Sequence, residues 1–377
     1  MSARLPFWFS LPRHPRRGSV ILFVLGVILL TAFLLTRLID RAGGELLAET
    51  KAASRTTLRD EAYSALEVSL AVLADVAAND RGLHAPAQGW GNPLEYAAYE
   101  APPGFTVTVS FEDETGKLPL ATVSETVLQQ YLVNIGSTTT DAERLADALL
   151  AWTKTDYLPR TTEADPRTYE NAALPYAPPH RALHSFEELR AIAIIRDLFF
   201  DHEGQWTELG DKFRADVSLQ SFNRVNVNSA RPSVLVALGL DPTLAVTMAD
   251  ELAPTPDPSR DPKFYRTIAE AAAEHGTGLT TAGLGADVQC LCIRVTVRQG
   301  ARVFQLEAVV SPGGNRARTP TEATTPTTTA PTTSDSSANP AATTNPATPV
   351  DPRAITTKSI DYPFRILELR ETDGPAQ

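Results

Sequence analysis

The start of the chain restricts its fold more than any other segment, because a short basic leader runs directly into an uncharged apolar stretch. The leader, residues 1–18, holds four arginines and no acidic residue, and the apolar stretch covers residues 19–36. As an α-helix that stretch would rise about 27 Å, which is enough to cross the core of a lipid bilayer. Arginines in the leader favour a cytoplasmic N-terminus. We therefore expect a single membrane span, with the bulk of the chain exported.

Small residues around the apolar stretch offer two processing sites. An ordinary secretory signal is cleaved after its apolar segment, whereas Gly18 stands before it. Cleavage between Gly18 and Ser19 would leave the membrane helix on the mature chain. Gly44 also follows small residues, but its charged neighbours Asp40 and Arg41 disfavour cleavage there. A signal anchor that is never cleaved fits the same leader.

A helical pattern continues beyond the apolar stretch. Apolar side chains recur every three or four residues, at Leu58, Ala62, Leu66, Leu70 and Leu73. This spacing predicts one buried stripe on a long helix. We expect a transmembrane part at residues 19–38 and an amphipathic part at residues 39–80. The adjacent glycines 43 and 44 each cost about 1 kcal/mol in a helix, so we expect a hinge between the two parts.

The remainder of the chain alternates between strand and helix signals, and it predicts an α+β fold. Residues 81–121 hold the first strands, because apolar and polar side chains alternate from Phe105 to Phe111. Residues 122–286 predict short helices with a strand-to-helix corner at residues 222–240. Residues 287–311 predict a hairpin, and residues 359–377 predict a final strand and tail. We expect the long helix to pack on an antiparallel sheet, with the helical domain inserted between strands.

Capping residues predict where several helices begin. In a capping box a hydroxyl side chain accepts a hydrogen bond from a first-turn amide, and a glutamate three residues later reaches back. The matching pairs are Thr122 with Glu125, Thr140 with Glu143, and Ser185 with Glu188. In the corner, which also contains Asn226, either Asn228 or Ser229 would cap the next helix, and Pro232 would suit its first turn.

A biased tract separates the hairpin from the final strand. Residues 312–358 are dominated by Thr, Pro, Ala and Ser, and such a composition cannot bury a core. We expect this tract to be disordered and open to O-glycosylation. It would be an insertion in a hairpin loop, which costs little because the entropy of loop closure grows only logarithmically with length.

Charge argues against a nucleic-acid partner. The formal net charge is −11, and it becomes −15 when the leader with its four arginines is removed, so the surface repels phosphates. The pattern N-x-N-x-A, present here at residues 226–230 and followed by a short helix, also opens helix-hairpin-helix modules that bind DNA. Here the turn that would approach the phosphates holds Asp241, which repels them, and Pro242, which lacks an amide donor.

The sequence carries no catalytic constellation. The six histidines show no ligand spacing, and no G-x-S-x-G motif is present. Cys290 and Cys292 alternate on one strand face with Cα atoms about 6.6 Å apart, so we expect no disulfide between them. We expect no enzymatic activity.

Five features together resemble the K-type minor pseudopilins of type II secretion, the general secretion pathway protein K family, which is related to the type IV pilins. They are the leader ending at Gly18, the acidic turn D-E-T-G-K at residues 113–117, an acidic loop with S-F-E-E-L at residues 185–189, the corner N-V-N-S-A-R-P at residues 226–232, and the terminal strands. Most pilins carry glutamate five residues after the cleavage site, and this chain has Phe23 there. Within the family that difference marks the K-type subunit, which has no subunit ahead of it.

The resemblance implies a function and a location. The chain would be a minor pseudopilin at the tip of the type II secretion pseudopilus, where it starts and caps assembly for the export of folded proteins across the outer membrane. Prepilin peptidase would cleave it and its new N-terminus would be methylated. It would cross the bacterial inner membrane once, with most of the chain in the periplasm. A signal-anchored periplasmic protein or enzyme unrelated to pili is the alternative.

The resemblance also implies partners. These are the other minor pseudopilins, the major pseudopilin, the prepilin peptidase, the inner-membrane secretion platform and secreted substrates, with no nucleic acid among them. The system could serve secretion or a related pilus.

Exported pseudopilins often bind Ca²⁺, and one loop carries suitable oxygen ligands. The candidates are Asp156, Glu163, Asp165 and Glu170. Lys154 and Arg160 partly neutralise this loop, and the spacing matches no defined calcium loop, so a solvated surface loop is the other interpretation. Asp113 and Glu114 are further candidates.

Overall fold

The structure is a computed structural model that describes residues 19–171, 175–253, 263–276, 278–279, 283–312 and 363–375. The chain divides into two compact units, Met1–Arg59 and Asp60–Gln377. The predicted leader and all but the first residue of the Thr/Pro-rich tract lie outside the described residues.

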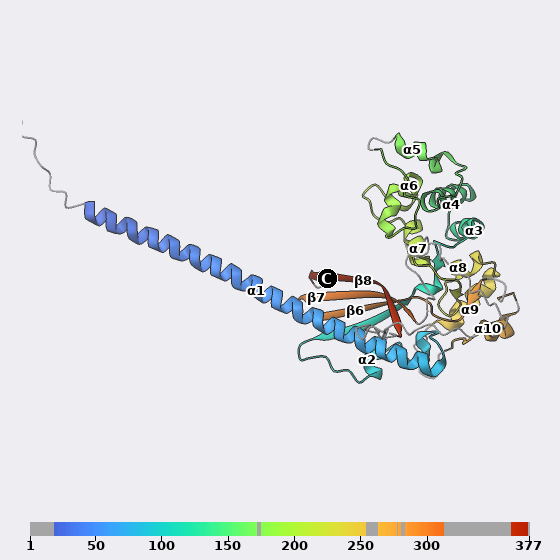
Figure 1. Cartoon of the computed structure of the whole chain (residues 1–377), viewed down its shortest axis with the longest axis horizontal. Coiled ribbons are helices and arrows are strands. Elements are labelled where there is room, and N and C mark those ends of the chain that lie inside the picture. The colour runs from blue at the N-terminus through green and yellow to red at the C-terminus, as the bar shows by residue number, and fades with distance from the viewer. Residues whose placement is uncertain are drawn as a thin grey trace, which may run out of the picture. The chain divides into compact units, whose positions relative to one another are not determined.

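A single helix, α1, runs from Ser19 to Asp80 (Figure 1). Its part Ile21–Glu45 is long and apolar enough to cross a membrane, with a mean hydropathy of 2.5 over an 18-residue window. This segment overlaps the predicted span, residues 19–38, whose limits stay a prediction. Gly43 and Gly44 are both helical, so they do not interrupt the helix as predicted. Their cost of about 1 kcal/mol each is small for a helix of 62 residues.

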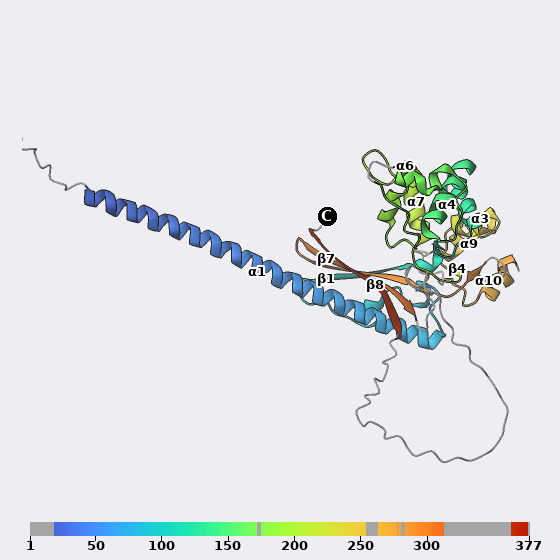
Figure 2. The same ribbon diagram turned by 45° about the horizontal axis from the view of Figure 1, so that its top comes forward.

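In the second unit, α1 places its apolar stripe inward. Ala62, Leu66 and Leu73 are buried, whereas Leu70 is half-buried. Both views show this part of the helix running along the sheet (Figures 1 and 2). The Tyr63 hydroxyl of this helix donates a hydrogen bond of 2.7 Å to Glu371 of the last strand. The predicted packing of a long helix on the sheet is confirmed.

The main sheet is antiparallel and has four strands in the order β1-β6-β7-β8. The strands are β1 (Thr106–Asp113), β6 (Leu291–Gln299), β7 (Arg302–Pro312) and β8 (Phe364–Pro375). In the central strand β6, Leu291, Ile293, Val295 and Val297 are buried, as their alternation predicts. A register irregularity lies between Val309 and Val310 of β7, opposite β8. The α+β fold class is confirmed.

Two short parallel ladders are formed by strands that lie between β1 and β6 in the sequence. One pairs β2 (Leu118–Pro119) with β3 (Val217–Ser218), and the other pairs β4 (Val225–Asn226) with β5 (Leu284–Gly285). Each pairs strands that are distant in the sequence, so the ladders fix the path of the helical segment that runs between β1 and β6.

Short helices make up most of this segment and gather at one end of the main sheet (Figures 1 and 2). The α-helices are α3 (Glu125–Asn134), α4 (Thr139–Thr153), α5 (Pro166–Glu170), α6 (Ala193–Phe199), α7 (Glu208–Asp216), α8 (Pro232–Ala237), α9 (Pro242–Leu252) and α10 (Ile268–His275). A further one, α2 (Pro93–Tyr96), precedes β1. Short 3₁₀ helices cover Pro86–Gln88, Glu114–Gly116, Thr162–Ala164 and Phe186–Ala191.

The helical segment and the sheet share a hydrophobic core. Tyr131, Phe199 and Phe213 from the helices belong to the same cluster of buried side chains as Cys292 and Val309 from β6 and β7. Because Cys292 and the buried Ile293 point to opposite faces of β6, the sheet is covered on both faces there.

Several helices begin at other residues than the capping boxes predicted. The N-cap of α3 is Ser124, whose Oγ accepts from the Val127 amide at 3.4 Å, and the N-cap of α4 is Thr138. Thr122 and Thr140 are therefore not the caps. The predicted Ser185 does cap, but it begins the 3₁₀ helix Phe186–Ala191. A run of hydroxyl residues before each helix offers several capping registers, and the buried helix face decides among them.

The cap of α3 allows a direct comparison of the two positions. We expect Ser124→Ala to lower the free energy of unfolding by about 1 kcal/mol, because an N-terminal amide of α3 loses its acceptor. Thr122→Ala should change it by less than about 0.5 kcal/mol, since the Thr122 hydroxyl makes only a 3.5 Å contact with the Pro119 carbonyl. Urea denaturation of the full chain in detergent, followed by tryptophan fluorescence, measures both. Equal losses would mean that Thr122 shares the capping role.

Candidate functional site

The acidic turn and the asparagine corner, which are distant in the sequence, meet in the structure. At the end of β1, Oδ2 of Asp113 accepts hydrogen bonds from Asn226 Nδ2 at 2.7 Å and from Ser229 Oγ at 2.5 Å. Its other oxygen, Oδ1, accepts from the Thr115 amide at 2.8 Å. We call Asp113, Thr115, Asn226, Asn228 and Ser229 the junction, because they join the end of the main sheet to the strand-to-helix corner.

The two asparagines extend the junction to two further loops. Asn226 Nδ2 also donates to the His84 carbonyl at 2.8 Å. Asn228 Nδ2 donates to the carbonyls of Tyr265 at 2.9 Å and Ala286 at 3.2 Å, and Asn228 Oδ1 accepts from the Tyr265 amide at 2.7 Å. His84 Nδ1 lies 2.7 Å from the Ala286 carbonyl oxygen. Backbone groups in these loops thus find partners without a regular ladder.

Asn228 and Ser229 do not cap the next helix, so the predicted capping role is wrong. The N-cap of α8 is Arg231, which makes no side-chain capping bond. Asn228 and Ser229 instead bond to neighbouring loops and to Asp113, as described above. Pro232 occupies the first turn of α8 as predicted.

Contacts with neighbouring segments restrict two other residues of the acidic turn, Thr115 and Gly116. Thr115 is buried, and its Oγ1 accepts from the amides of Gln289 and Cys290 at 2.8 and 2.9 Å. A Cβ on Gly116 would lie 2.5 Å from Ser229 Oγ and 2.8 Å from the Ser229 carbonyl oxygen. No side chain therefore fits at Gly116 without moving the corner.

Ion pairs hold the two ends of the turn. Lys117 Nζ lies 2.6 Å from a carboxylate oxygen of both Glu112 and Glu114, and the Ser218 hydroxyl donates to Glu114 at 2.6 Å. Burial alone would lower the pKa of Lys117, but the two carboxylates raise it above its ordinary value. Lys117 therefore stays charged, and it ties β1 to the turn.

The carboxyl group of Asp113 is in an unusual electrostatic position. The residue keeps some exposed surface, but protein surrounds its carboxyl group. Burial raises the pKa of Asp113 to about 6, although the hydrogen bonds from Ser229, Asn226 and Thr115 act in the opposite direction.

Residues 112–200 match the family model described as type II secretion system (T2SS), protein K. The chain carries a protein K domain. The family resemblance predicted from the motifs is confirmed.

A chain in the crystal structure of the GspK–GspI–GspJ complex from the enterotoxigenic Escherichia coli type 2 secretion system is similar, with a TM-score of 0.49 and 15% sequence identity. The similarity covers 70% of this chain and 95% of that chain. The comparison with curated proteins found no match.

The protein K domain contains one half of the junction. Its matched segment begins at residue 112 and includes the acidic turn and the S-F-E-E-L run. The asparagine corner lies beyond residue 200, yet it bonds directly to the turn. Sequence reasoning found both motifs but missed their contact. It also missed His84, whose bond to the corner is made by its backbone carbonyl and leaves no signal in the side-chain sequence.

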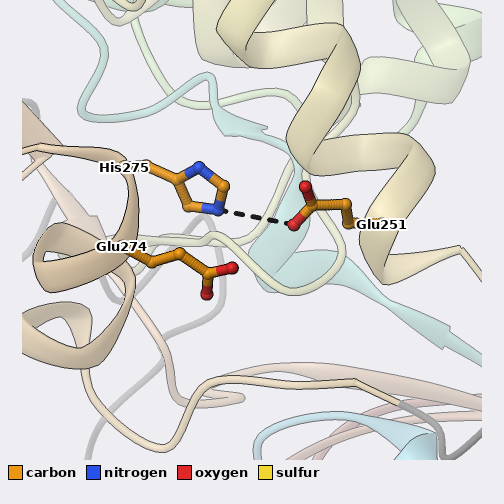
Figure 3. A group of neighbouring side chains, drawn as sticks. All are labelled: Glu251, Glu274 and His275. Carbon is orange, nitrogen blue, oxygen red and sulfur yellow. Dashed lines mark ion pairs between the residues drawn. The ribbon is translucent and has the colours of Figure 1, made fainter.

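The predicted calcium ligands of the protein K domain do not converge in the structure. Glu163 forms an ion pair with Arg144, and Asp165 caps α5 through the Arg167 amide. Asp156 and Glu170 are exposed. None of the four belongs to the group of three potential metal ligands found among the described residues. That group is formed by Glu251, Glu274 and His275 (Figure 3).

The residues predicted to concern processing and assembly lie at the start of the chain. Gly18 falls outside the described residues, and Ser19 is the first residue of α1. Phe23 lies within the apolar segment Ile21–Glu45, and 73% of its surface is exposed. The helix therefore has no carboxylate at this position.

The raised pKa of Asp113 predicts a pH dependence of stability. Its ordinary value is 3.8 and its value in the folded chain is about 6, so the folded state binds this proton more tightly between those values. Stability from this group is present below about pH 4 and is lost as the pH rises through about 6. The difference in unfolding free energy between the wild type and Asp113→Asn should therefore shrink over that range.

Urea denaturation at several pH values measures this difference. Glu95→Gln, which removes an exposed carboxylate from α2, is the control. A difference between the wild type and Asp113→Asn that grows from pH 4 to 6 would mean that the hydrogen bonds outweigh burial.

Proposed function

We propose that this chain is the minor pseudopilin at the tip of a type II secretion pseudopilus, where it starts and caps assembly. The observation that carries the proposal is the protein K match at residues 112–200 in a chain whose first helix contains the apolar segment Ile21–Glu45. In this proposal the chain crosses the inner membrane once, and the bulk of it lies in the periplasm.

Phe23 supports the tip position. A carboxylate in a membrane helix costs about 2.5–3.5 kcal/mol on insertion scales, so other subunits keep one only where it has a partner. In the family that partner is the N-terminal ammonium group of the subunit ahead. A subunit with Phe23 has no such demand, which fits the end of the fibre.

The helical segment between β1 and β6 supports the same position. Repeating subunits of this size would crowd a helical fibre, whereas one subunit at the end meets no neighbour above it. We propose the other minor pseudopilins as its direct partners, and the major pseudopilin and the inner-membrane platform as later ones. The motifs and the match give the protein no catalytic role.

The mature N-terminus tests membership of the pilin class. With the cognate prepilin peptidase present, we expect mass spectrometry to find a chain that begins at Ser19 and is N-methylated. Without the peptidase, the leader should remain. A chain that begins at Glu45, or keeps Met1 in both strains, would contradict the proposal and indicate a secreted or simply anchored protein.

Substitution at Phe23 tests the tip position. Phe23→Glu places a carboxylate in the membrane without a partner, so we expect less of the chain to co-purify with the other minor pseudopilins and less protein to be secreted. Phe23→Leu keeps an apolar side chain and should leave both unchanged. Both are measured in a strain that lacks the wild-type chain. Equal or higher secretion by Phe23→Glu would contradict the tip position.

A further inference from the structure

The ends of two helices bring potential metal ligands together from different parts of the chain. Glu251 lies in the last turn of α9, and Glu274 and His275 are the last two residues of α10. One ligand atom from each lies within 4.8 Å of the others. Figure 3 shows the His275 ring and the two carboxylates turned toward a common space.

The spacing suits a tetrahedral ion. His275 Nε2 and Glu251 Oε2 are 3.6 Å apart. Two ligands that each lie about 2.0–2.1 Å from a tetrahedral zinc ion are about 3.4 Å from one another. The three ligand atoms lie within 4.8 Å of one another, so an ion would draw the carboxylates inward and displace Lys263 Nζ, with water as a fourth ligand.

The electrostatics at this place favour a cation. The C-terminal end of a helix carries partial negative charge, and here two helices end with glutamates in their last turns. Lys263 lies between them, with its Nζ 2.6 Å from Glu251 and 2.7 Å from Glu274. One lysine against two carboxylates leaves a net negative charge on these three side chains. A divalent ion would balance both carboxylates.

Tyr265 orients the imidazole. Its hydroxyl lies 2.8 Å from His275 Nε2 and 2.9 Å from a Glu274 oxygen. If the hydroxyl donates to Glu274, Nε2 carries the ring proton and donates to the hydroxyl oxygen, so a bound ion would take the place of this proton at Nε2. His275 is well enclosed, since only 9% of its side chain is exposed.

We propose that Glu251, Glu274 and His275 form a binding site for a divalent transition-metal ion such as Zn²⁺, which displaces the ammonium group of Lys263. One imidazole and two carboxylates suit zinc, whereas Ca²⁺ and Mg²⁺ prefer oxygen ligands in larger number. The ion would cross-link the ends of α9 and α10. This site is distinct from the calcium candidates in the loop at residues 156–170.

Calorimetry of the full chain in detergent, stripped of metal and titrated with ZnCl₂, tests the site. We expect one saturable site per chain. Loss of groups that merely support metal ligands lowers affinity about 10- to 100-fold, so Glu251→Gln and His275→Gln should each weaken binding by more than about tenfold. Asp250→Asn, which removes an exposed carboxylate beside Glu251 on the same helix, should bind zinc like the wild type.

Lys263→Met separates a metal site from a lysine-neutralised pair. If zinc displaces the lysine, removing this competitor should tighten binding. Binding by Lys263→Met but not by the wild type would overturn the proposal, because the lysine would then be the resident cation. No saturable binding by either chain, or equal binding by wild type and His275→Gln, would also overturn it. Circular dichroism of each variant shows whether it is folded.

Discussion

The hydrogen bonds accepted by the Asp113 carboxylate join the main sheet to the strand-to-helix corner. Asp113 ends β1, and through Asn226 and Ser229 it fixes the corner that leads into α8. A buried carboxylate with three donors is stable only as a complete set, because losing one donor leaves a costly unpaired group. The close approach of Gly116 to Ser229 depends on the corner staying at this position. Thr115 ties the same turn to a third segment, through the amides of Gln289 and Cys290.

The sequence predicted which segments form helices and strands and which faces they bury, but not where the helices begin or which distant segments meet. The period-two alternation in β6 and the apolar stripe of α1 reflect burial directly, and both agree with the structure. The caps of α3 and α4 were misplaced because a hydroxyl residue occurs at several positions before each helix, and tertiary packing chooses among them. The glycines at 43 and 44 do not form the predicted hinge, because their local cost does not break a long helix.

At the candidate sites, too, the sequence predicted the separate motifs but not the contacts between them. Sequence motifs identified both halves of the junction, because each motif is compact along the chain. Their contact depends on the pairing of β1 with β6 and of β4 with β5, which no local pattern specifies. Glu251 and His275 are unrelated in sequence spacing, so only the meeting of two helix ends reveals them. Carboxylates that are close in sequence, such as Glu163 and Asp165, are instead used by an arginine and a helix cap.

The register of the main sheet places both long connections of the chain at one end of the sheet. Asp113 is paired with Leu291, and Pro312 with Phe364, so the long stretches between these residues each leave and rejoin the sheet about 4.8 Å apart. Both departures lie at one end of the sheet, while a tight turn between Gln299 and Arg302 closes β6 and β7 at the other. Insertions and deletions at the first end need not alter the pairing of the four strands of the main sheet. The protein can tolerate changes of chain length there, whereas the tight turn between β6 and β7 leaves little room for them.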